Sequence, residues 1–134
     1  MSRYMLDTDI ASYAMKGTNA TVYRRFAQVA VGTICISAIV KAELEFGIVL
    51  HPLPDRARAG LALLMQHVDV LDFPAEAAHD YGEIRADLKK RGQIIGSNDM
   101  LIAAHARYLG LTLVTNNVRE FSRIPDLKLE NWAE

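Results

Sequence analysis

The organisation of this chain is set by the stretch Arg3-Tyr4-Met5-Leu6-Asp7-Thr8-Asp9. A short apolar run ends in a carboxylate, Asp7, and the next residues, Thr8 and Asp9, are good helix N-caps. This pattern predicts a buried strand whose end carries an acid toward a helix. Ligands of open α/β sheets bind at the carboxyl ends of the strands, so we expect Asp7 at the site of chemistry. Simple helix capping is the favoured interpretation for Asp9 only, because Asp7 alone has partners elsewhere in the chain.

Length and composition predict a single domain that spans residues 1–134. The chain is 51% hydrophobic and 23% charged, and it has no linker, internal repeat or low-complexity tract. Its longest apolar stretch, 29–40, is too short for the roughly 20 residues that a membrane span needs. Acids at positions 7 and 9 also interrupt any signal-peptide core. We therefore expect a cytoplasmic protein without a membrane partner, in which the single Cys35 is a small core residue.

Strands and helices are expected to alternate along the whole chain. After the first strand, further strands are predicted at 33–36, 68–71, 112–114 and 127–129. Helices are predicted at 10–16, from Asn19 through Val29, after Ser37 through Leu50, through 61–65, from Pro74 to Arg91, at 98–109 after a Ser97 cap, and as one turn at 118–121. This order predicts an α/β fold with a central parallel sheet of four to five strands, right-handed crossovers and helices on both faces.

The helix after Ser37 carries an apolar face made of Ile39, Ala42, Phe46 and Leu50. Glu43 adjoins that face. We expect Phe46 to be a core or dimer contact and not a platform for stacking RNA bases.

Carboxylates recur at the predicted carboxyl ends of strands and in the adjoining helices. Asp7 ends the first strand, Glu43 follows the second, Asp99 lies in the helix before the fourth, and Asn117 with Glu120 follows the fourth. Carboxylates roughly 5 Å apart repel by about 3 kcal/mol per pair at an effective dielectric of 20, so such a cluster requires a cation. Hard oxygen ligands suit Mg²⁺ or Mn²⁺, and metal-bound water can hydrolyse a phosphodiester.

Together these segments resemble the PIN-domain ribonucleases, and specifically the VapC toxins of bacterial type II toxin–antitoxin pairs. Each segment is weak alone, but they span nearly the whole chain in the family's order. The matching segments are Met5-Leu6-Asp7-Thr8-Asp9, Ile36-Ser37 with Ala42-Glu43-Leu44 and Gly47, Asn98-Asp99 leading into Leu101-Ile102-Ala103-Ala104-His105-Ala106, and Val114-Thr115-Asn116-Asn117 with Arg119-Glu120-Phe121.

The resemblance implies a PIN-like α/β/α sandwich and an Mg²⁺- or Mn²⁺-dependent endoribonuclease in which Asp7, Glu43 and Asp99 bind the metal. Many family members have an aspartate at the position of Asn117, so the fourth catalytic group is left open between Asn117 and Glu120. Hydrogen bonds to the carboxylates are expected from three hydroxyl residues, Thr8, Ser37 and Thr115. For Ser37, N-capping is an equally good interpretation.

The resemblance also implies partners. We expect a homodimer, a cognate VapB-type antitoxin that inserts a segment near the acids, and a structured RNA substrate such as transfer or ribosomal RNA. DNA would be contacted only indirectly, through the antitoxin complex. The sequence leaves open which RNA bond is cut, how many metal ions bind and where the dimer interface lies.

Basic residues could guide RNA toward the acids. The run Lys89-Lys90-Arg91 precedes the loop that leads to Asp99, and with Arg85 and Arg119 it forms a candidate phosphate track. A solvated helix end is the simpler interpretation of the run. The four histidines show no paired metal-ligand spacing, and we expect His105 to have a structural role or to lie on the surface.

Two other functions agree less well with the sequence. Asp7-Thr8-Asp9 after a strand also resembles the nucleophile loop of haloacid-dehalogenase-type phosphatases, but Ile10-Ala11 lacks the small Gly-Thr step and Glu43 would have no role. A catalytically inactive PIN-fold interaction module is disfavoured because the set of acids is intact.

Overall fold

The computed structural model describes all residues, 1–134, and its centre is a parallel sheet of five strands. The strands lie in the order β3-β2-β1-β4-β5, and every neighbouring pair is parallel. Their bounds are β1 (Tyr4–Leu6), β2 (Ile34–Ser37), β3 (Asp69–Leu71), β4 (Thr112–Val114) and β5 (Lys128–Glu130). The predicted α/β class and all five strands are confirmed, with boundaries that differ by a residue or two.

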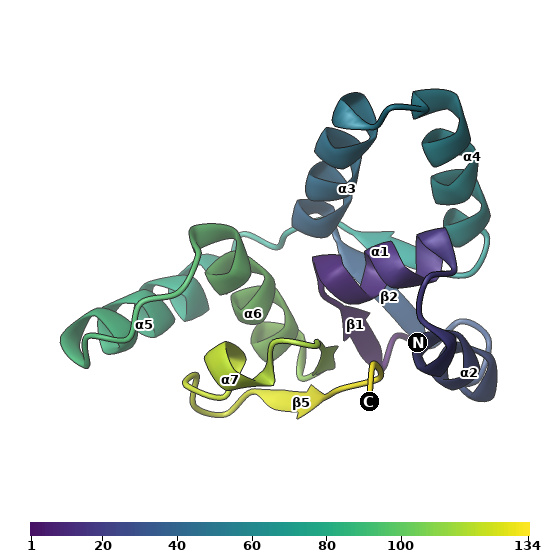
Figure 1. Cartoon of the computed structure of the whole chain (residues 1–134). Helices are drawn as coiled ribbons and strands as arrows, with labels where there is room; N and C mark the ends of the chain where they lie inside the picture. The colour runs from purple at the N-terminus through teal and green to yellow at the C-terminus, as the bar shows by residue number, and fades with distance from the viewer.

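Seven helices cover the two faces of this sheet (Figure 1). The chain runs outward from β1 to β3 and then crosses to β4, so right-handed connections place the earlier and later helices on opposite faces. The earlier group is α1 (Thr8–Lys16), α2 (Ala20–Gln28), α3 (Ala38–Leu50) and α4 (Pro54–Met65), and the later group is α5 (Ala77–Lys90), α6 (Ser97–Leu109) and α7 (Val118–Phe121). At the carboxyl edge of the sheet, α3 and α6 meet.

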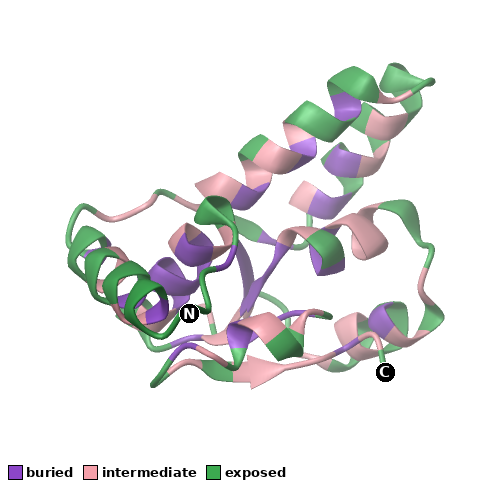
Figure 2. Ribbon diagram, turned by 60° about the vertical axis from the view of Figure 1, so that its left-hand side comes forward, coloured by how far each residue is buried: buried purple, intermediate pink, exposed green.

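The core lies on both sides of the central strands, where the buried residues gather in Figure 2. Cys35 is buried in β2, as expected of a small core residue. The single Trp132 is also fully buried and packs edge-on against Tyr4, with ring centroids 5.2 Å apart. None of the helices combines the length and the apolar character needed to span a membrane.

The structure corrects three predicted helix starts. Asp7, and not Asp9, is the N-cap of α1, because its extended backbone lets Oδ1 accept a hydrogen bond from Ile10 N at 3.0 Å. Gly96, and not Ser97, is the N-cap of α6. Pro74 lies in a turn closed by Ala77 N donating to its carbonyl, and α5 begins only after that turn.

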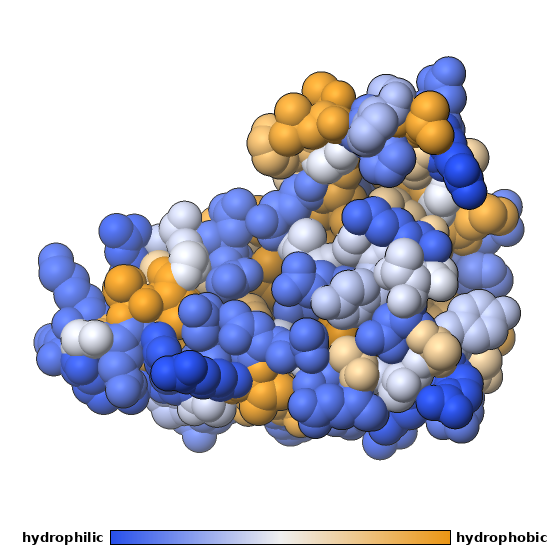
Figure 3. Space-filling view, viewed as in Figure 1, coloured by the Kyte–Doolittle hydropathy of each residue, from blue (hydrophilic) through white to orange (hydrophobic).

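The buried face of α3 also differs from the prediction. Val40, Leu44 and Ile48 face the core, whereas Phe46 and Leu50 are each 67% exposed. This helix is apolar around most of its circumference, so spacing alone does not select the buried stripe. Figure 3 shows the resulting apolar surface at the protruding end of α3 and α4.

Candidate active site

The crevice between the carboxyl ends of β1 and β4 contains Asp7. The chain leaves β1 for one face of the sheet and leaves β4 for the other, so the connections after the two strands diverge at this point. The two ends are tied by Asp7 N, which donates to the Val114 carbonyl at 2.9 Å. Side chains that follow β1 and β4 are therefore brought to one place.

Asp7 is a buried carboxylate with both oxygens hydrogen-bonded. Thr115 Oγ1 donates to Oδ2 at 2.6 Å, and Ile10 N donates to Oδ1. Burial nevertheless raises the pKa of Asp7 to about 6, because removing the charged form from water outweighs these two bonds. Nearby Asp9 and Asp99 raise the pKa further.

Glu43 reaches the crevice from the second turn of α3. Its Oε1 accepts a short hydrogen bond from Thr8 Oγ1 at the start of α1. Because α1 and α3 pack together, this bond fixes the carboxylate against the end of β1. Thr8 and Thr115 thus each hold one acid.

Asp99 enters from the opposite wall, in the first turn of α6. Its pKa is raised to about 6, first by burial and then by the charges of Glu43, Glu120 and Asp9. Carboxylates from three different elements therefore share one electrostatic environment.

Asn117 and Glu120 form a pair after β4. Asn117 Nδ2 donates to Glu120 Oε2 at 2.9 Å, and Asn117 N donates to Thr115 Oγ1 at 2.8 Å. Asn117 lines the crevice, while Glu120 is half-buried and close enough to raise the pKa of Asp99. The amide therefore orients the carboxylate, a contact that the sequence did not reveal.

Asp9 is a site residue that the sequence reasoning missed. It is exposed, lines the crevice and raises the pKa of both Asp7 and Asp99. The available signal was its place in the first helical turn, two residues after the acid that ends β1. Capping does not account for this position, because Asp7 is the N-cap of α1.

Around these side chains lies the acidic cleft, a cavity of about 210 Å³ with one apolar wall residue. No three of the chain's acids, histidines or cysteine converge closely enough to hold an ion by direct coordination alone. Mg²⁺ usually takes one or two carboxylates and keeps several waters, so this hard-oxygen donor set fits such an ion. The residues that line the cleft are Asp7, Thr8, Asp9, Glu43, Asp99, Asn117 and Phe121.

Ser37 does not hydrogen-bond a carboxylate, contrary to the expectation for its hydroxyl group. It is the N-cap of α3, where Oγ accepts from Ile39 N at 3.1 Å, and it also bonds His105 Nδ1 at 2.9 Å. His105 is fully buried in α6, in agreement with a structural role.

The predicted basic residues are all exposed, but some of their side chains are already held by hydrogen bonds or an ion pair. Arg91 is paired with Asp87 at 2.7 Å and also bonds the Arg123 carbonyl, while Arg85 bonds the Tyr81 hydroxyl. The ion pair fixes Arg91 against its own helix. The remaining members, Lys89, Lys90 and Arg119, make no side-chain hydrogen bond or ion pair.

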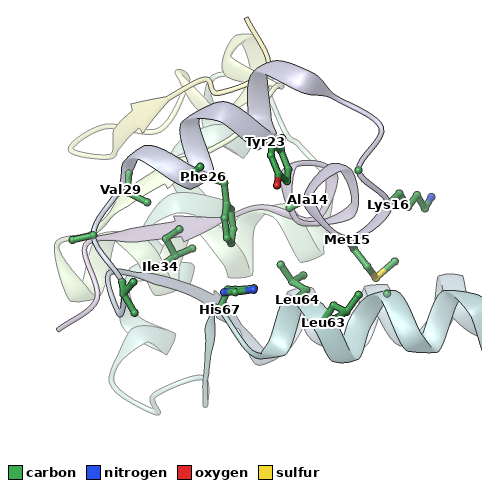
Figure 4. A pocket seen from close by; sticks show the side chains of 15 residues that line it. Ala14, Met15, Lys16, Tyr23, Phe26, Val29, Ile34, Leu63, Leu64 and His67 are labelled. Atoms are coloured by element: carbon green, nitrogen blue, oxygen red, sulfur yellow. The ribbon is translucent and has the colours of Figure 1, made fainter.

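A second hollow, the apolar groove, lies between α1, α2 and α4 (Figure 4). It measures about 510 Å³, and eleven of its fifteen lining residues are hydrophobic. Phe26 from α2 points toward Leu64 and His67, and the Phe26 and His67 rings meet edge-on at 6.2 Å. Tyr23 and Leu63, both largely exposed, form its rim. The sequence did not predict this surface.

Comparison with known proteins relates the whole chain to one group. Residues 4–127 match the PIN domain family model. Ribonuclease VapC2 of Haemophilus influenzae is 45% identical over 134 residues, 99% of this chain and 100% of that relative. The tRNA(fMet)-specific endonuclease VapC of Shigella flexneri is 41% identical over 133 residues, with coverage of 99% and 100%. In the crystal structure of VapBC2 from Rickettsia felis bound to a promoter DNA fragment, a chain of 41% identity superposes with a TM-score of 0.91 over 98% of this chain and 99% of that one.

Proposed function

The chain belongs to the PIN-domain family, among the VapC ribonucleases of VapBC toxin–antitoxin pairs, and on that premise we propose that its acidic cleft hydrolyses RNA with a bound divalent cation. One observation carries the assignment. Two carboxyls from opposite walls of the cleft, Asp7 and Asp99, each have a pKa raised to about 6. Carboxyls whose charged form is disfavoured by burial and by neighbouring charges are typical of catalytic sites.

Asp7, Glu43 and Asp99 are proposed to bind Mg²⁺ or Mn²⁺, one or two of them directly and the rest through water. A cation there would offset the charge that raises the two pKa values, and when bound it supplies a water nucleophile and stabilises charge on the phosphate. Thr115 holds Asp7 and Thr8 holds Glu43, so two of the three carboxylates are oriented before any ion arrives.

Asn117 and Glu120 complete the proposed catalytic set. Because the Asn117 amide donates to Glu120, the carboxylate is turned toward the wall that carries Asp99. We assign Glu120 to the metal's outer sphere, through water, and Asn117 to orienting it. Asp9 joins them as a further charge that holds the cation in the cleft.

Transfer RNA is the proposed substrate. The Shigella flexneri relative is named a tRNA(fMet)-specific endonuclease and covers the full length of this chain. Lys89, Lys90 and Arg119, with Arg85 and Arg91, are proposed to contact phosphates beside the cleft. We place this activity in the cytoplasm.

A VapB-type antitoxin is the proposed protein partner, since the Rickettsia felis relative was solved as a VapBC complex on promoter DNA. The apolar groove is the surface that we assign to an antitoxin segment, because burial of its half-exposed side chains would stabilise a complex. DNA contact would then come from the antitoxin. A homodimer stays a prediction, with the exposed Phe46 and Leu50 as its candidate contacts.

The test is cleavage of tRNA by the purified chain in Mg²⁺ or Mn²⁺, with and without chelator. Cleavage at internal bonds should require the ion and should disappear in Asp99→Asn, while circular dichroism shows an intact fold. Equal cleavage by wild type and Asp99→Asn, or full activity in chelator, would refute the proposal.

A further inference from the structure

His105 and Ser37 join the two helices that carry Asp99 and Glu43. The two residues lie 68 positions apart, and His105 Nδ1 is 2.9 Å from Ser37 Oγ. His105 belongs to α6, the helix that carries Asp99, and Ser37 caps α3, the helix that carries Glu43. We propose that this hydrogen bond makes His105 a positioning residue, which sets the separation of Asp99 and Glu43.

The spacing along each helix supports this assignment. Asp99 precedes His105 by six residues and Glu43 follows Ser37 by six, so each acid lies about 9 Å along a rigid helix from the bond. A change in the tilt of either helix at the bond is carried to its acid. The Ser37 hydroxyl also accepts from Ile39 N, so the same atom fixes the first turn of α3 and its contact with α6.

The energetics of His105 favour a role beyond packing. Its side chain is fully buried, yet Nε2 has no hydrogen-bond partner. The Phe73 ring meets the imidazole edge-on, with the ring centroids 5.4 Å apart, and supplies no conventional hydrogen-bond partner. A buried polar atom without a partner costs free energy, and an aliphatic residue would avoid that cost. The imidazole is therefore kept at a cost in folding free energy. The hydrogen bond to Ser37 is the contact that an aliphatic residue could not make in its place.

Burial lowers the pKa of His105, so the ring is neutral near pH 7. The bond then joins two neutral groups, and either tautomer can make it, with donor and acceptor exchanged.

The test rests on the proposed metal-dependent nuclease and compares His105→Leu with Ile102→Val. The first variant removes the hydrogen bond at similar volume, and the second perturbs another fully buried residue of α6. We expect His105→Leu to weaken Mn²⁺ binding, measured by calorimetry without RNA. Single-turnover tRNA cleavage should slow by about three- to tenfold, which is less than the loss typical when a residue that hydrogen-bonds a metal ligand is removed. Ile102→Val should leave both near wild type even where its melting temperature falls.

Two further variants keep the proposal falsifiable should His105→Leu fold poorly. Ser37→Ala should weaken Mn²⁺ binding at least as much, since it also removes the cap of α3, and adding His105→Leu to it should lower the Mn²⁺ affinity little more, because the bond between the two residues is already absent. His105→Asn, whose amide can reach Ser37, should restore part of the Mn²⁺ affinity. Additive losses, or wild-type Mn²⁺ binding in a destabilised His105→Leu, would overturn the proposal.

Hydrogen exchange separates this proposal from the proposed nuclease. If the wild type itself binds no Mn²⁺, the metal-dependent function fails, but the link is still judged by amide exchange in residues 38–43. Faster exchange there in His105→Leu, and not in Ile102→Val, supports the link. Exchange that rises only within α6 contradicts it.

Discussion

The acidic cleft and the apolar groove are both hollows on one small domain, but they are built in opposite ways. The cleft is about 210 Å³ and brings together acids from β1, α1, α3 and α6, at least two of them with pKa values raised to about 6. The groove is about 510 Å³, is lined mainly by hydrophobic side chains and contains no acid. The cleft therefore costs stability because its acids are buried and repel one another, whereas the groove leaves apolar surface in water; the proposed cation and the proposed antitoxin would each remove one of these costs.

The largest expected effect separates catalysis from the groove. Asp99→Asn should reduce tRNA cleavage by well over about 100-fold, beyond the loss seen when an outer-sphere partner is removed. Its melting temperature without metal should stay level or rise, because one of several repelling charges is gone. Leu63→Glu in the groove should cleave like wild type. If Asp99→Asn instead unfolds the protein, the acids are structural and the contrast fails.

The second prediction concerns a change in the groove that should affect antitoxin binding and not cleavage. Leu63→Glu places a charge at a groove position that is 61% exposed, and it should weaken antitoxin binding by about 10- to 100-fold, as loss of an interface anchor does. Ala62→Glu is the matched control, since it adds the same charge to α4 outside the groove lining. Titration calorimetry with the purified antitoxin should distinguish the two. Equal antitoxin affinities of Leu63→Glu and Ala62→Glu would show that the antitoxin does not bind in the groove.

The pH dependence of stability should come from the cleft. The pKa of Asp7 is about 6 in the folded state against 3.8 for the free side chain, so the folded state binds this proton more tightly. The stabilising contribution is complete below pH 4 and is lost as the pH rises through 6, by about 1–2 kcal/mol after allowance for solvent screening. Urea unfolding in chelator should show that loss in wild type and in Leu63→Gln, and a smaller loss in Asp7→Asn, where only Asp99 still has a pKa raised to about 6. A slope of equal size in Asp7→Asn would assign the effect to other groups.

The smallest effect concerns the basic residues outside both hollows. Replacing Lys89, Lys90 and Arg91 together with alanine should weaken tRNA binding and flatten the plot of log affinity against log salt by about 0.7–0.9 per lost phosphate contact. Arg91 already pairs with Asp87, so Arg91→Ala alone should change the slope less than Lys90→Ala. Single-turnover cleavage at saturating RNA should stay near wild type. An unchanged slope in the triple variant would make the run an ordinary solvated helix end.

Local sequence patterns predicted where the acidic cleft lies, but not the role of each residue in it. The apolar run that ends in Asp7 is a short-range signal, and parallel strands bring their carboxyl ends to one edge, so the place of the acids followed from the sequence. Capping rules misled us, because Asp7 both caps α1 and faces the cleft, and this left Asp9 unassigned.

Long-range features could not be predicted in this way. The groove needs the relative positions of three helices, and the contact of His105 with Ser37 joins residues 68 apart with no local sign. On α3, the apolar residues surround the helix, so its packing against α1, α4 and α6 decides that Leu44 is buried and Phe46 exposed.

The position of β1 in the middle of the sheet has a consequence for protein synthesis. β1 is translated first, but its neighbour β4 is made more than a hundred residues later, and Thr115, which holds Asp7, follows β4. A nascent chain on the ribosome therefore lacks half of the central pairing and one wall of the cleft, and such distant contacts form slowly. The translation machinery can complete this chain before the chain is able to cut RNA, and that interval is available for an antitoxin to bind.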